Sequence, residues 1–525
     1  MKNIYLIAIL LFASHCLAQK SDKSTNSLSG LSKEELWHLN SFELDSVPGI
    51  DLSRALNFLK DKKSRPIVIA VIDSDVDIDH SWIKDILWSN PDETSDNGLD
   101  DDGNGYIDDI HGWNYLRNKK GTRINYASSS AIRYITQFKK QFKDTTLLRK
   151  SKDSISLDIY KQAWNSHKNS LENAKKELEF LYFIRDNYPI SKKVVDSIFY
   201  GKNYTLEDLD SLKFLYKGDD KLFKRIKFMH SFKRLKMEDD FAEKYKEEAH
   251  FKVSRTNNLD YYDRSSLKDN SMSINHIHYG SGIVNSFLNI LWHGTAVSGV
   301  LNYFDNTKIM ILSITPKTGS HTDEDLAKAI RYAVDNGAKV INMSSSNDFS
   351  PNNEIVLQAL KYAENKGVIF VRSAGNSGQN IDEYTTFPNN DNNLTNFLIV
   401  GASGKSIEKS LKPSWANYGK NKIDLFAPGE DILTAEVLKE TKLISGSSMS
   451  APLVAGTIAL IKSHYPNLTI SQIKEILHKS VDKYNVDITL ENGEKVPFSD
   501  LSISGGILNA YKAVKLADII SNKQK

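Results

Sequence analysis

The chain has 525 residues, of which 40% are hydrophobic and 26% are charged, values that are ordinary for a soluble globular protein. They exclude a membrane-spanning or wholly disordered chain, and the length allows a large core and a second module. The formal net charge is only +2, but residues 116–270 hold 34 Lys and Arg against 22 Asp and Glu, a net of +12 that leaves −10 for the remainder. This asymmetry predicts two modules with different surfaces.

The first 18 residues, MKNIYLIAILLFASHCLA, have the pattern of a secretory signal peptide. Lys2 precedes an apolar run, and Ala18 is the small residue expected before a cleavage site. We therefore expect an exported protein, secreted, periplasmic or at the cell surface, with no transmembrane span once the signal is removed. Cys16 is the only cysteine, so cleavage after Ala18 leaves no thiol and no disulfide. A lipid anchor on Cys16 is an alternative, which the bulky His15 before it disfavours.

A buried strand that ends in an acidic residue is predicted next. The run PIVIAVI (66–72) is continuously apolar, as in a strand covered on both faces. Asp73 follows directly, so its carboxylate lies at the strand end, where backbone donors can keep it ionised. Asp73 is therefore a candidate to orient a catalytic base. The alternative is a carboxylate that only caps the strand.

The acidic stretch NGLDDDGNGYIDD (97–109) has the order of a calcium loop. Gly105 allows the sharp turn, but His111 occupies the twelfth place, where a bidentate Glu belongs. We therefore expect a weaker site, or a last ligand from elsewhere, such as Asp109. Oxygen ligands favour Ca²⁺ over zinc or copper, and the expected role is structural. A solvated acidic turn is the alternative. The predicted ligands, at places one, three, five, seven and nine, are Asp100, Asp102, Asn104, the Tyr106 carbonyl and Asp108.

Residues 116–278 interrupt the pattern of short buried strands. Long charged segments space their apolar residues as on helices, without a sustained heptad, so a helical insertion is predicted. Acidic residues are interspersed with the basic ones and no nucleic-acid motif accompanies them, so nucleic acid is not an expected partner. The net positive charge favours an acidic protein surface as a partner of the insertion, through contacts that salt would weaken.

Beyond the insertion, short apolar runs again alternate with helical segments. Helices are predicted over 322–337, which begins at a capping threonine, and over 352–367. Strands separated by helices of this length predict an α/β fold with a mostly parallel central sheet covered on both faces. Catalytic groups in such folds gather at the carboxyl ends of the strands. The predicted strands are 308–314, 338–344, 367–374 and 397–403.

Two further stretches supply groups that can work with Asp73. LWHGTAVSGVL contains His293, and LISGSSMSAPLVAGTIALI (443–461) contains Ser448 near a predicted helix start. A serine hydroxyl becomes a nucleophile when a base takes its proton, and a third group should orient that base. Taken separately, His293 could be a core histidine and Ser448 a helix cap. Taken together with Asp73, these alternatives are weak.

The three blocks VIDSDVD, HGTAVSG and GSSMSAP, in the order Asp, His, Ser, resemble the signature blocks of the subtilisin-like serine proteases, the subtilases. The resemblance covers roughly residues 36–114 and 279–518 and does not include the helical insertion. It implies a three-layer subtilisin-like fold and hydrolysis of polypeptide substrates through an acyl-enzyme, with Asp73, His293 and Ser448 as the catalytic triad.

The resemblance also implies further site residues. FVRSAGNSGQN is similar to the block that carries the oxyanion-hole asparagine, which assigns Asn376 to that role beside the backbone N–H of Ser448. VINMSSS is similar to the strand on which subtilases lay an extended peptide, so Ser344, Ser345 and Ser346 should border the substrate cleft. Acidic loops after the aspartate block also occur in subtilases, which supports calcium.

Three positions depart from the family pattern. Asp75 stands where glycine is usual, so we expect backbone strain there and raised pKa values of nearby groups. Ser346 also replaces a glycine and is expected to narrow the primary specificity pocket, whereas Ser447 in place of threonine is a mild change. Because the triad is intact, we predict an active enzyme. The alternative is a catalytically weakened subtilase scaffold that acts as a binding or surface-assembly protein.

The sequence thus predicts an exported serine endopeptidase. Its expected parts are a signal peptide (1–18), an N-terminal part of the peptidase domain with the acidic loop (19–115), a charged helical insertion (116–278) and the remainder of the peptidase domain (279–525).

Overall fold

The computed structural model describes residues 32–142, 151–267, 279–285, 292–390, 393–408, 410–437 and 440–523. The predicted signal peptide, including Cys16, lies outside the described residues. In the part of the chain that is described, no helix is both long enough and apolar enough to cross a membrane.

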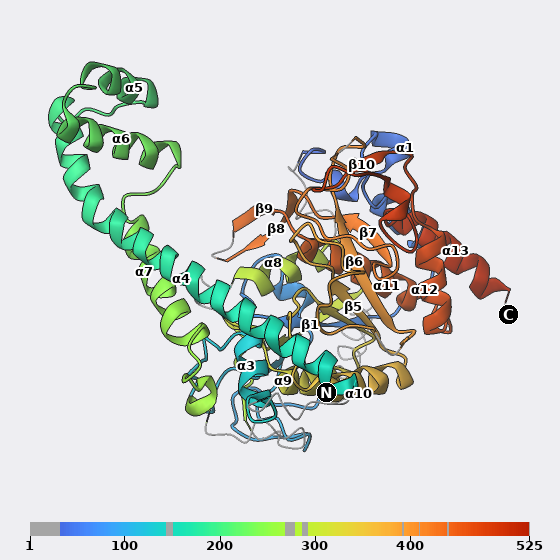
Figure 1. The fold of residues 1–525 in the computed structure, drawn as a ribbon. Helices are drawn as coiled ribbons and strands as arrows, with labels where there is room; N and C mark the ends of the chain where they lie inside the picture. Colours follow the sequence, from blue (N-terminus) through green and yellow to red (C-terminus); the bar gives the residue numbers. More distant parts are fainter. Residues whose placement is uncertain are drawn as a thin grey trace, which may run out of the picture.

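A sheet lies at the centre of the molecule (Figure 1). It has seven parallel strands in the order β2-β3-β1-β4-β5-β6-β7. Its strands are buried almost throughout, as the continuous apolar runs predict. The predicted α/β class is therefore confirmed. The strands are β1 (Ile67–Asp73), β2 (Gly112–Asn114), β3 (Thr307–Ser313), β4 (Val340–Met343), β5 (Ile369–Ser373), β6 (Phe397–Ser403) and β7 (Leu425–Pro428).

Helices cover both faces of this sheet, which gives the predicted three layers. Successive side chains of β1 point to opposite faces. Ile69 and Val71 pack in one core with α8 (Trp292–Leu301) and α11 (Ser447–His464). Ala70 and Ile72 pack in a second core with α9 and α10. The remaining helices and short hairpins of this body are α1 (Phe42–Asp45), α2 (Leu52–Leu59), α9 (Asp323–Asp335), α10 (Asn353–Asn365), α12 (Ile470–Lys479), α13 (Ala510–Asn522), β8 (Ile432–Glu436), β9 (Glu440–Ile444), β10 (Asp487–Thr489) and β11 (Lys495–Pro497).

The predicted helical region is also present and extends away from the body. α4 leaves the body as one long helix, α7 runs back along it, and α5 and α6 lie at its far end (Figure 1). A small separate core at that end includes Ile184, Leu209, Ile226 and Phe232. We call this end of the helical region, residues 180–237, the distal knob. The helices are α3 (Ser130–Phe138), α4 (Ser151–Ile198), α5 (Leu206–Leu215), α6 (Asp220–Arg234) and α7 (Phe241–Phe251).

Buried ion pairs and rings attach this helical region to the body. Arg264 is almost fully buried, and its Nη1 lies 2.6 Å from Oδ2 of Asp325 on α9. Tyr134 of α3 packs its ring 5.9 Å from that of Phe349, which follows β4 in the chain. The base of the helical region is thus part of the packed body, whereas the distal knob is remote from it.

Candidate active site

The site is built on the carboxyl end of β1. Asp73 is the last residue of that strand and is fully buried, and the Ser74 N–H donates to its Oδ1 at 2.7 Å. His293, the second residue of α8, places Nδ1 2.8 Å from Oδ1 and 2.9 Å from Oδ2 of Asp73. Because a carboxylate only accepts, Nδ1 carries the hydrogen and Nε2 is left with its lone pair. This is the orientation that a general base requires.

Small residues allow α8 to approach β1 this closely. A side chain at Gly294 would place its Cβ 2.5 Å from the carbonyl oxygen of Ser74, closer than atoms can pack. The Gly294 N–H instead donates to Ser74 Oγ at 2.9 Å. The glycine that follows His293 is therefore a packing requirement of the site.

Two opposing effects act on the pKa of His293. Burial disfavours the charged ring, but the Coulomb attraction of Asp73 and its hydrogen bond outweigh burial, so the pKa of His293 is raised above its ordinary value. The ring remains partly exposed, with 29% of its side-chain surface accessible, so a substrate can reach it.

Strand register brings Ser448 to the same edge of the sheet. Ile72 of β1 is paired with Met343 of β4, so the next residues, Asp73 and Ser344, lie side by side at the strand ends. The Ser448 hydroxyl donates to the carbonyl oxygen of Ser344 at 3.1 Å, and the Ser344 hydroxyl donates to that of Ser448 at 2.9 Å. The two segments are thereby locked together at the start of α11.

Ser448 is the second residue of α11, and only 9% of it is exposed. Among the described residues, its hydroxyl hydrogen-bonds to Ser344 and not to His293. Catalytic hydrogen bonds are often long in the absence of substrate and tighten in the complex. The Ser448 hydroxyl has to leave its hydrogen bond to Ser344 before a base can take its proton.

Asn376 lies beside Ser448, as the resemblance implies. Its side-chain oxygen accepts the N–H of Ser447 at 2.8 Å, which leaves its amide nitrogen as a donor. A Cβ at Gly446 would stand 3.4 Å from that nitrogen and 3.8 Å from the backbone nitrogen of Ser448. Both donors thus border the same small space, which glycine keeps open. This arrangement suits an oxyanion.

The three serines predicted to border the cleft follow β4 directly. Ser344 is buried, and Ser345 and Ser346 are partly exposed. Within the described ranges, the backbone groups of Ser345 and Ser346 take part in no hydrogen bond, so they are free to pair with an extended peptide. Ser447 supports the site from the other side, because its hydroxyl accepts the Gly375 N–H at 3.0 Å.

Comparison with known proteins decides the family. Residues 64–495 match the model of the Subtilase family. The chain belongs to the subtilases. A thermophilic serine proteinase of Bacillus sp. (strain AK1) is 34% identical over 186 residues, which are 35% of this chain and 43% of that protein. A cell wall-associated protease of Bacillus subtilis (strain 168) is 30% identical over 252 residues, 43% of this chain and 27% of that protein.

Thermitase of Thermoactinomyces vulgaris is 30% identical over 234 residues, which are 42% of this chain and 75% of that protein. The match spans less than half the length of the other two relatives. The family match and these relatives agree in assigning the chain to the subtilases.

The expected strain at Asp75 of this subtilase is absent. Asp75 is not among the described non-glycine residues with positive φ. Its carboxylate is fully buried and accepts from Arg117 Nη2 at 2.8 Å, Arg123 Nε at 3.0 Å and Asn114 Nδ2 at 3.1 Å. The guanidinium groups of Arg117 and Arg123 thus compensate the negative charge of Asp75, which was expected to raise the pKa values of nearby groups. Neither arginine was predicted from the sequence, although a buried carboxylate requires a partner.

The acidic loop brings together a ligand set that differs in part from the predicted one. Asp100 and Asp102 lie with Glu93, and each offers an oxygen within 4.8 Å of the others. In the described part of the chain, Asp100 Oδ1 and Glu93 Oε2 are buried without a hydrogen-bond partner. Carboxylate oxygens left in this way fit a hard cation such as Ca²⁺. Glu93 was missed because it precedes the loop.

The other predicted ligands are used differently. The Asp108 carboxylate lies outside this cluster and accepts the backbone N–H groups of Asn97 and Gly98 at 3.1 Å. Asn104 donates to Asp102 Oδ2 at 2.9 Å, and its own oxygen accepts the Tyr106 N–H at 2.7 Å. Asp109 also lies outside the cluster, and burial raises its pKa. The loop residues therefore follow the order of a calcium loop in the sequence, but in the fold several of their side chains are bonded elsewhere.

Proposed function

We propose that this subtilase is an exported serine endopeptidase with Asp73, His293 and Ser448 as its triad. Ser448 attacks the scissile carbonyl, His293 takes the hydroxyl proton and returns it to the leaving amine, and Asp73 holds the ring in the required tautomer. The side-chain amide of Asn376 and the backbone N–H of Ser448 stabilise the oxyanion. The observation that carries this proposal is that His293 Nδ1 lies within hydrogen-bond distance of both carboxylate oxygens of Asp73.

The substrates proposed are polypeptides bound in an extended conformation. The backbone of Ser345 and Ser346 supports this, because it has no partner among the described residues and an extended chain can add to it through main-chain hydrogen bonds. Ser344 fixes the position of this edge through its reciprocal hydrogen bonds with Ser448. The hydroxymethyl group of Ser346, in place of glycine, is proposed to favour small side chains next to the cut.

A structural Ca²⁺ is the proposed ligand of the acidic cluster. Glu93, Asp100 and Asp102 would hold it. Asn104 and the Tyr106 carbonyl remain proposed as further ligands, whereas Asp108 is proposed to hold the loop through its bonds to backbone N–H groups. The cation would balance the carboxylate charges and fix the loop ahead of β2. It takes no part in bond cleavage.

The proposed location is outside the cytoplasm, as a secreted, periplasmic or cell-surface protein. The amino-terminal pattern with Lys2 and Ala18 supports export, and one relative is a cell wall-associated protease. The proposed division of the chain is the one predicted from the sequence, with the helical insertion at 116–278.

The competing proposal is a weakened scaffold that binds or assembles other proteins. Asp75 and Ser346 were the sequence features in its favour. The pairing of Asp75 with Arg117 and Arg123 removes the first of them, because the extra carboxylate is compensated. Catalysis is therefore the better supported function.

Labelling with a fluorophosphonate, which reacts with activated serines, tests the proposal directly. The purified chain should be labelled and should cleave a mixed peptide library, whereas Ser448→Ala and His293→Ala should do neither. Ser445→Ala is a matched control, because Ser445 is exposed on the turn before α11 and should label normally. A well-folded wild-type chain that neither labels nor cleaves would support the scaffold instead.

A further inference from the structure

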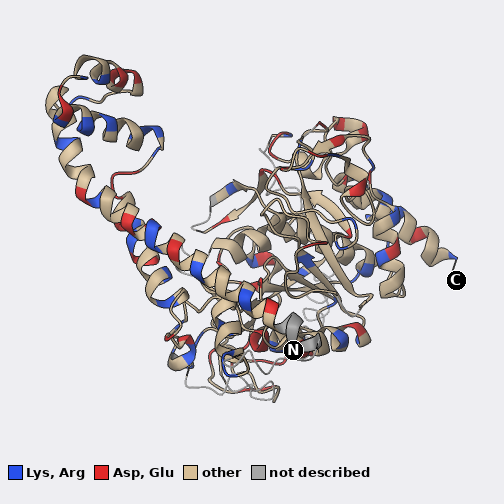
Figure 2. Cartoon of the chain, viewed as in Figure 1, with Lys and Arg blue, Asp and Glu red and all other residues tan. Residues whose placement is uncertain are grey.

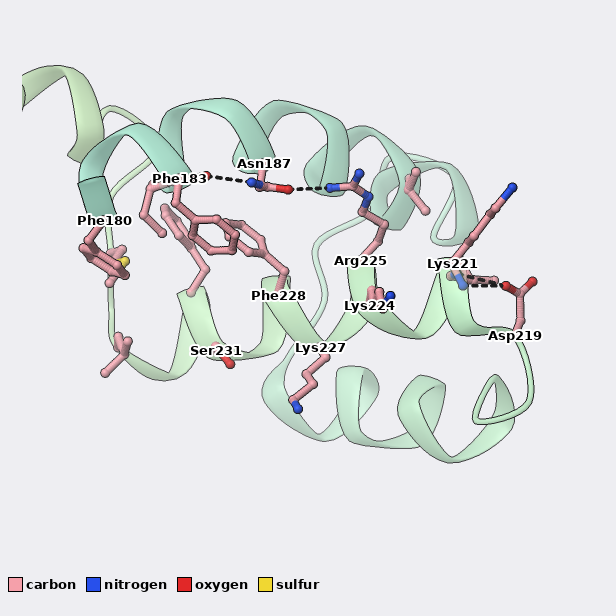
Figure 3. Close-up of a pocket in the computed structure, with 16 residues that line it drawn as sticks. Phe180, Phe183, Asn187, Asp219, Lys221, Lys224, Arg225, Lys227, Phe228 and Ser231 are labelled. Atoms are coloured by element: carbon pink, nitrogen blue, oxygen red, sulfur yellow. Dashed lines mark hydrogen bonds between the residues drawn. The ribbon is translucent and has the colours of Figure 1, made fainter. Parts of the chain in front are cut away.

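The distal knob contains a groove that the peptidase chemistry does not use. It lies between α4 and α6 and has a volume of about 960 Å³ (Figure 3). Phe183 of α4 and Phe228 of α6 line it with their rings in contact, and Leu235, the residue that follows α6, also lines it. The groove is remote from the triad, because the distal knob stands at the far end of α4 (Figure 1).

The apolar surface of this groove is open to solvent. Phe183 is 53% exposed and Leu235 is 59% exposed, although the ring of Phe183 lies 5.7 Å from that of Phe228. Phe180, which also lines the groove, is 42% exposed. Large apolar side chains gathered in one exposed hollow mark a surface that buries them against a partner.

Positive charge surrounds this apolar surface. Lys221, Lys224 and Lys227 of α6 line the groove and are exposed, and among the described residues none of them forms an ion pair. Other lysines nearby are paired, such as Lys192 with Asp196 at 2.9 Å. The basic character of α6 contrasts with the mixed charges along α4 (Figure 2).

The remaining charged groups of the groove are already engaged. Arg225 Nη1 donates to Asn187 Oδ1 at 2.9 Å, which holds the arginine against α4. Asp219 is the acidic residue of the lining, and its Oδ1 accepts the N–H groups of Lys221 and Leu222 as the cap of α6. Asp219 therefore serves the helix end, and the three lysines keep a net positive field over the groove.

We propose that this groove binds an acidic, amphipathic helical segment of another polypeptide. A helix laid along the junction of α4 and α6 can pack apolar residues spaced i, i+3, i+4 and i+7 onto the rings of Phe183 and Phe228, while its acidic face meets the lysines. A hollow between two helices suits a helix better than a lipid surface, which favours protruding apolar groups. The site is distinct from the triad and acts whether or not a peptide bond is cut.

Binding can be measured without cleavage on the full chain carrying Ser448→Ala. The probe is a fluorescent amphipathic peptide of about 18 residues, long enough for five helical turns, with Leu and Phe on one face and Glu on the other. The controls are a scrambled peptide of the same composition and a version with Lys in place of Glu. The acidic amphipathic probe should bind at least about tenfold more tightly than either, and high salt should weaken it.

Variants of the groove locate the site. Lys224→Glu/Lys227→Glu and, separately, Phe183→Ala should each weaken binding of the acidic probe by about tenfold or more. The matched controls Lys202→Glu and Phe214→Ala change exposed residues of the distal knob outside the groove and should bind as the parent does. Unchanged circular dichroism establishes that the variants are folded.

Three outcomes would overturn the proposal. Equal binding of the scrambled peptide would show a nonspecific surface. Full affinity in both groove variants would place the binding elsewhere. Binding of anionic phospholipid vesicles in place of the acidic probe, lost in the same variants, would make the groove a lipid site.

Discussion

Arg117 Nη2 lies 2.8 Å from Oδ2 of Asp75, and this contact joins the chain after β2 to the strand end that carries Asp73. Arg123 Nε approaches the other oxygen of the same carboxylate at 3.0 Å, and the Arg123 side chain is only 5% exposed. Asp75 is fully buried. A charge inside the protein is tolerated only when it is paired, so the departure from glycine at this position depends on both arginines.

Removing one arginine should therefore destabilise the fold. Arg123→Gln leaves the buried Asp75 carboxylate with one cation, and we expect the free energy of unfolding to fall by about 3 kcal/mol in urea denaturation. Arg185→Gln breaks an exposed pair with Asp186 and should cause no measurable change. The double variant Asp75→Asn/Arg123→Gln should lose less than the sum of the two single variants, because the charges are coupled. Additive losses would show that the pairing contributes nothing.

The raised pKa of His293 predicts how activity depends on pH. The ring accepts the Ser448 proton only when it is neutral, so kcat/KM should rise with pH through a midpoint above about 6.5, the ordinary value for histidine. The stability of the fold should depend on pH in the opposite direction. Because the pKa of His293 is higher in the folded chain, its protonation stabilises the fold below about pH 6.5, and this contribution is lost as pH rises through the folded value.

The Asp73→Asn variant separates the two effects on that pKa. Loss of the carboxylate leaves burial as the dominant effect, so the pKa of His293 should shift below its ordinary value. The rate should fall by about 10⁴-fold, because the ring loses its required tautomer. Titration of His293 by NMR in the Ser448→Ala background would measure both shifts. A pKa unchanged by Asp73→Asn would contradict the proposed role of this contact.

Asn376→Ala tests the second donor of the oxyanion hole. We expect kcat to fall by about 10² to 10³-fold with little change in KM, because the amide would act on charge that develops only in the transition state. Gly446→Ala should also lower kcat, since its methyl group would enter the space between the two donors. Gln379→Ala removes an exposed amide from the same loop and should retain activity. A rise in KM alone would instead place Asn376 in ground-state binding.

The three residues proposed as the triad stand out in the local sequence because each lies where two elements meet. Asp73 ends a strand, His293 and Ser448 begin helices, and short blocks with glycines surround all three. The parallel sheet was equally predictable, since its strands are apolar throughout. Pairing between distant segments was not predictable in this way, and the arginines that neutralise Asp75 were missed for that reason.

In the distal knob and the acidic loop, too, contacts between distant segments could not be predicted from the local sequence. Helical periodicity predicted the long helices of the insertion, but which apolar residues stay exposed depends on how α4 and α6 pack. Phe183 looks like a core residue in the sequence and is half exposed in the fold. In the loop, regular spacing pointed to Asp108, whereas folding brings Glu93 to Asp100 and Asp102.

The acidic cluster predicts a stability that depends on calcium. Chelation should lower the melting temperature of the chain, because Glu93, Asp100 and Asp102 then repel one another without a cation between them. Glu93→Gln should raise the calcium concentration needed to restore that temperature. Asp96→Asn is the matched control, since Asp96 is an exposed acid of the same segment outside the cluster.

The variant Asp108→Asn tests whether the calcium ligands are those of the folded cluster or those that regular loop spacing predicts. It should change calcium affinity less than Glu93→Gln does, because the Asp108 carboxylate is already bonded to backbone N–H groups. A larger loss from Asp108→Asn would restore the ligand order that the spacing alone predicts.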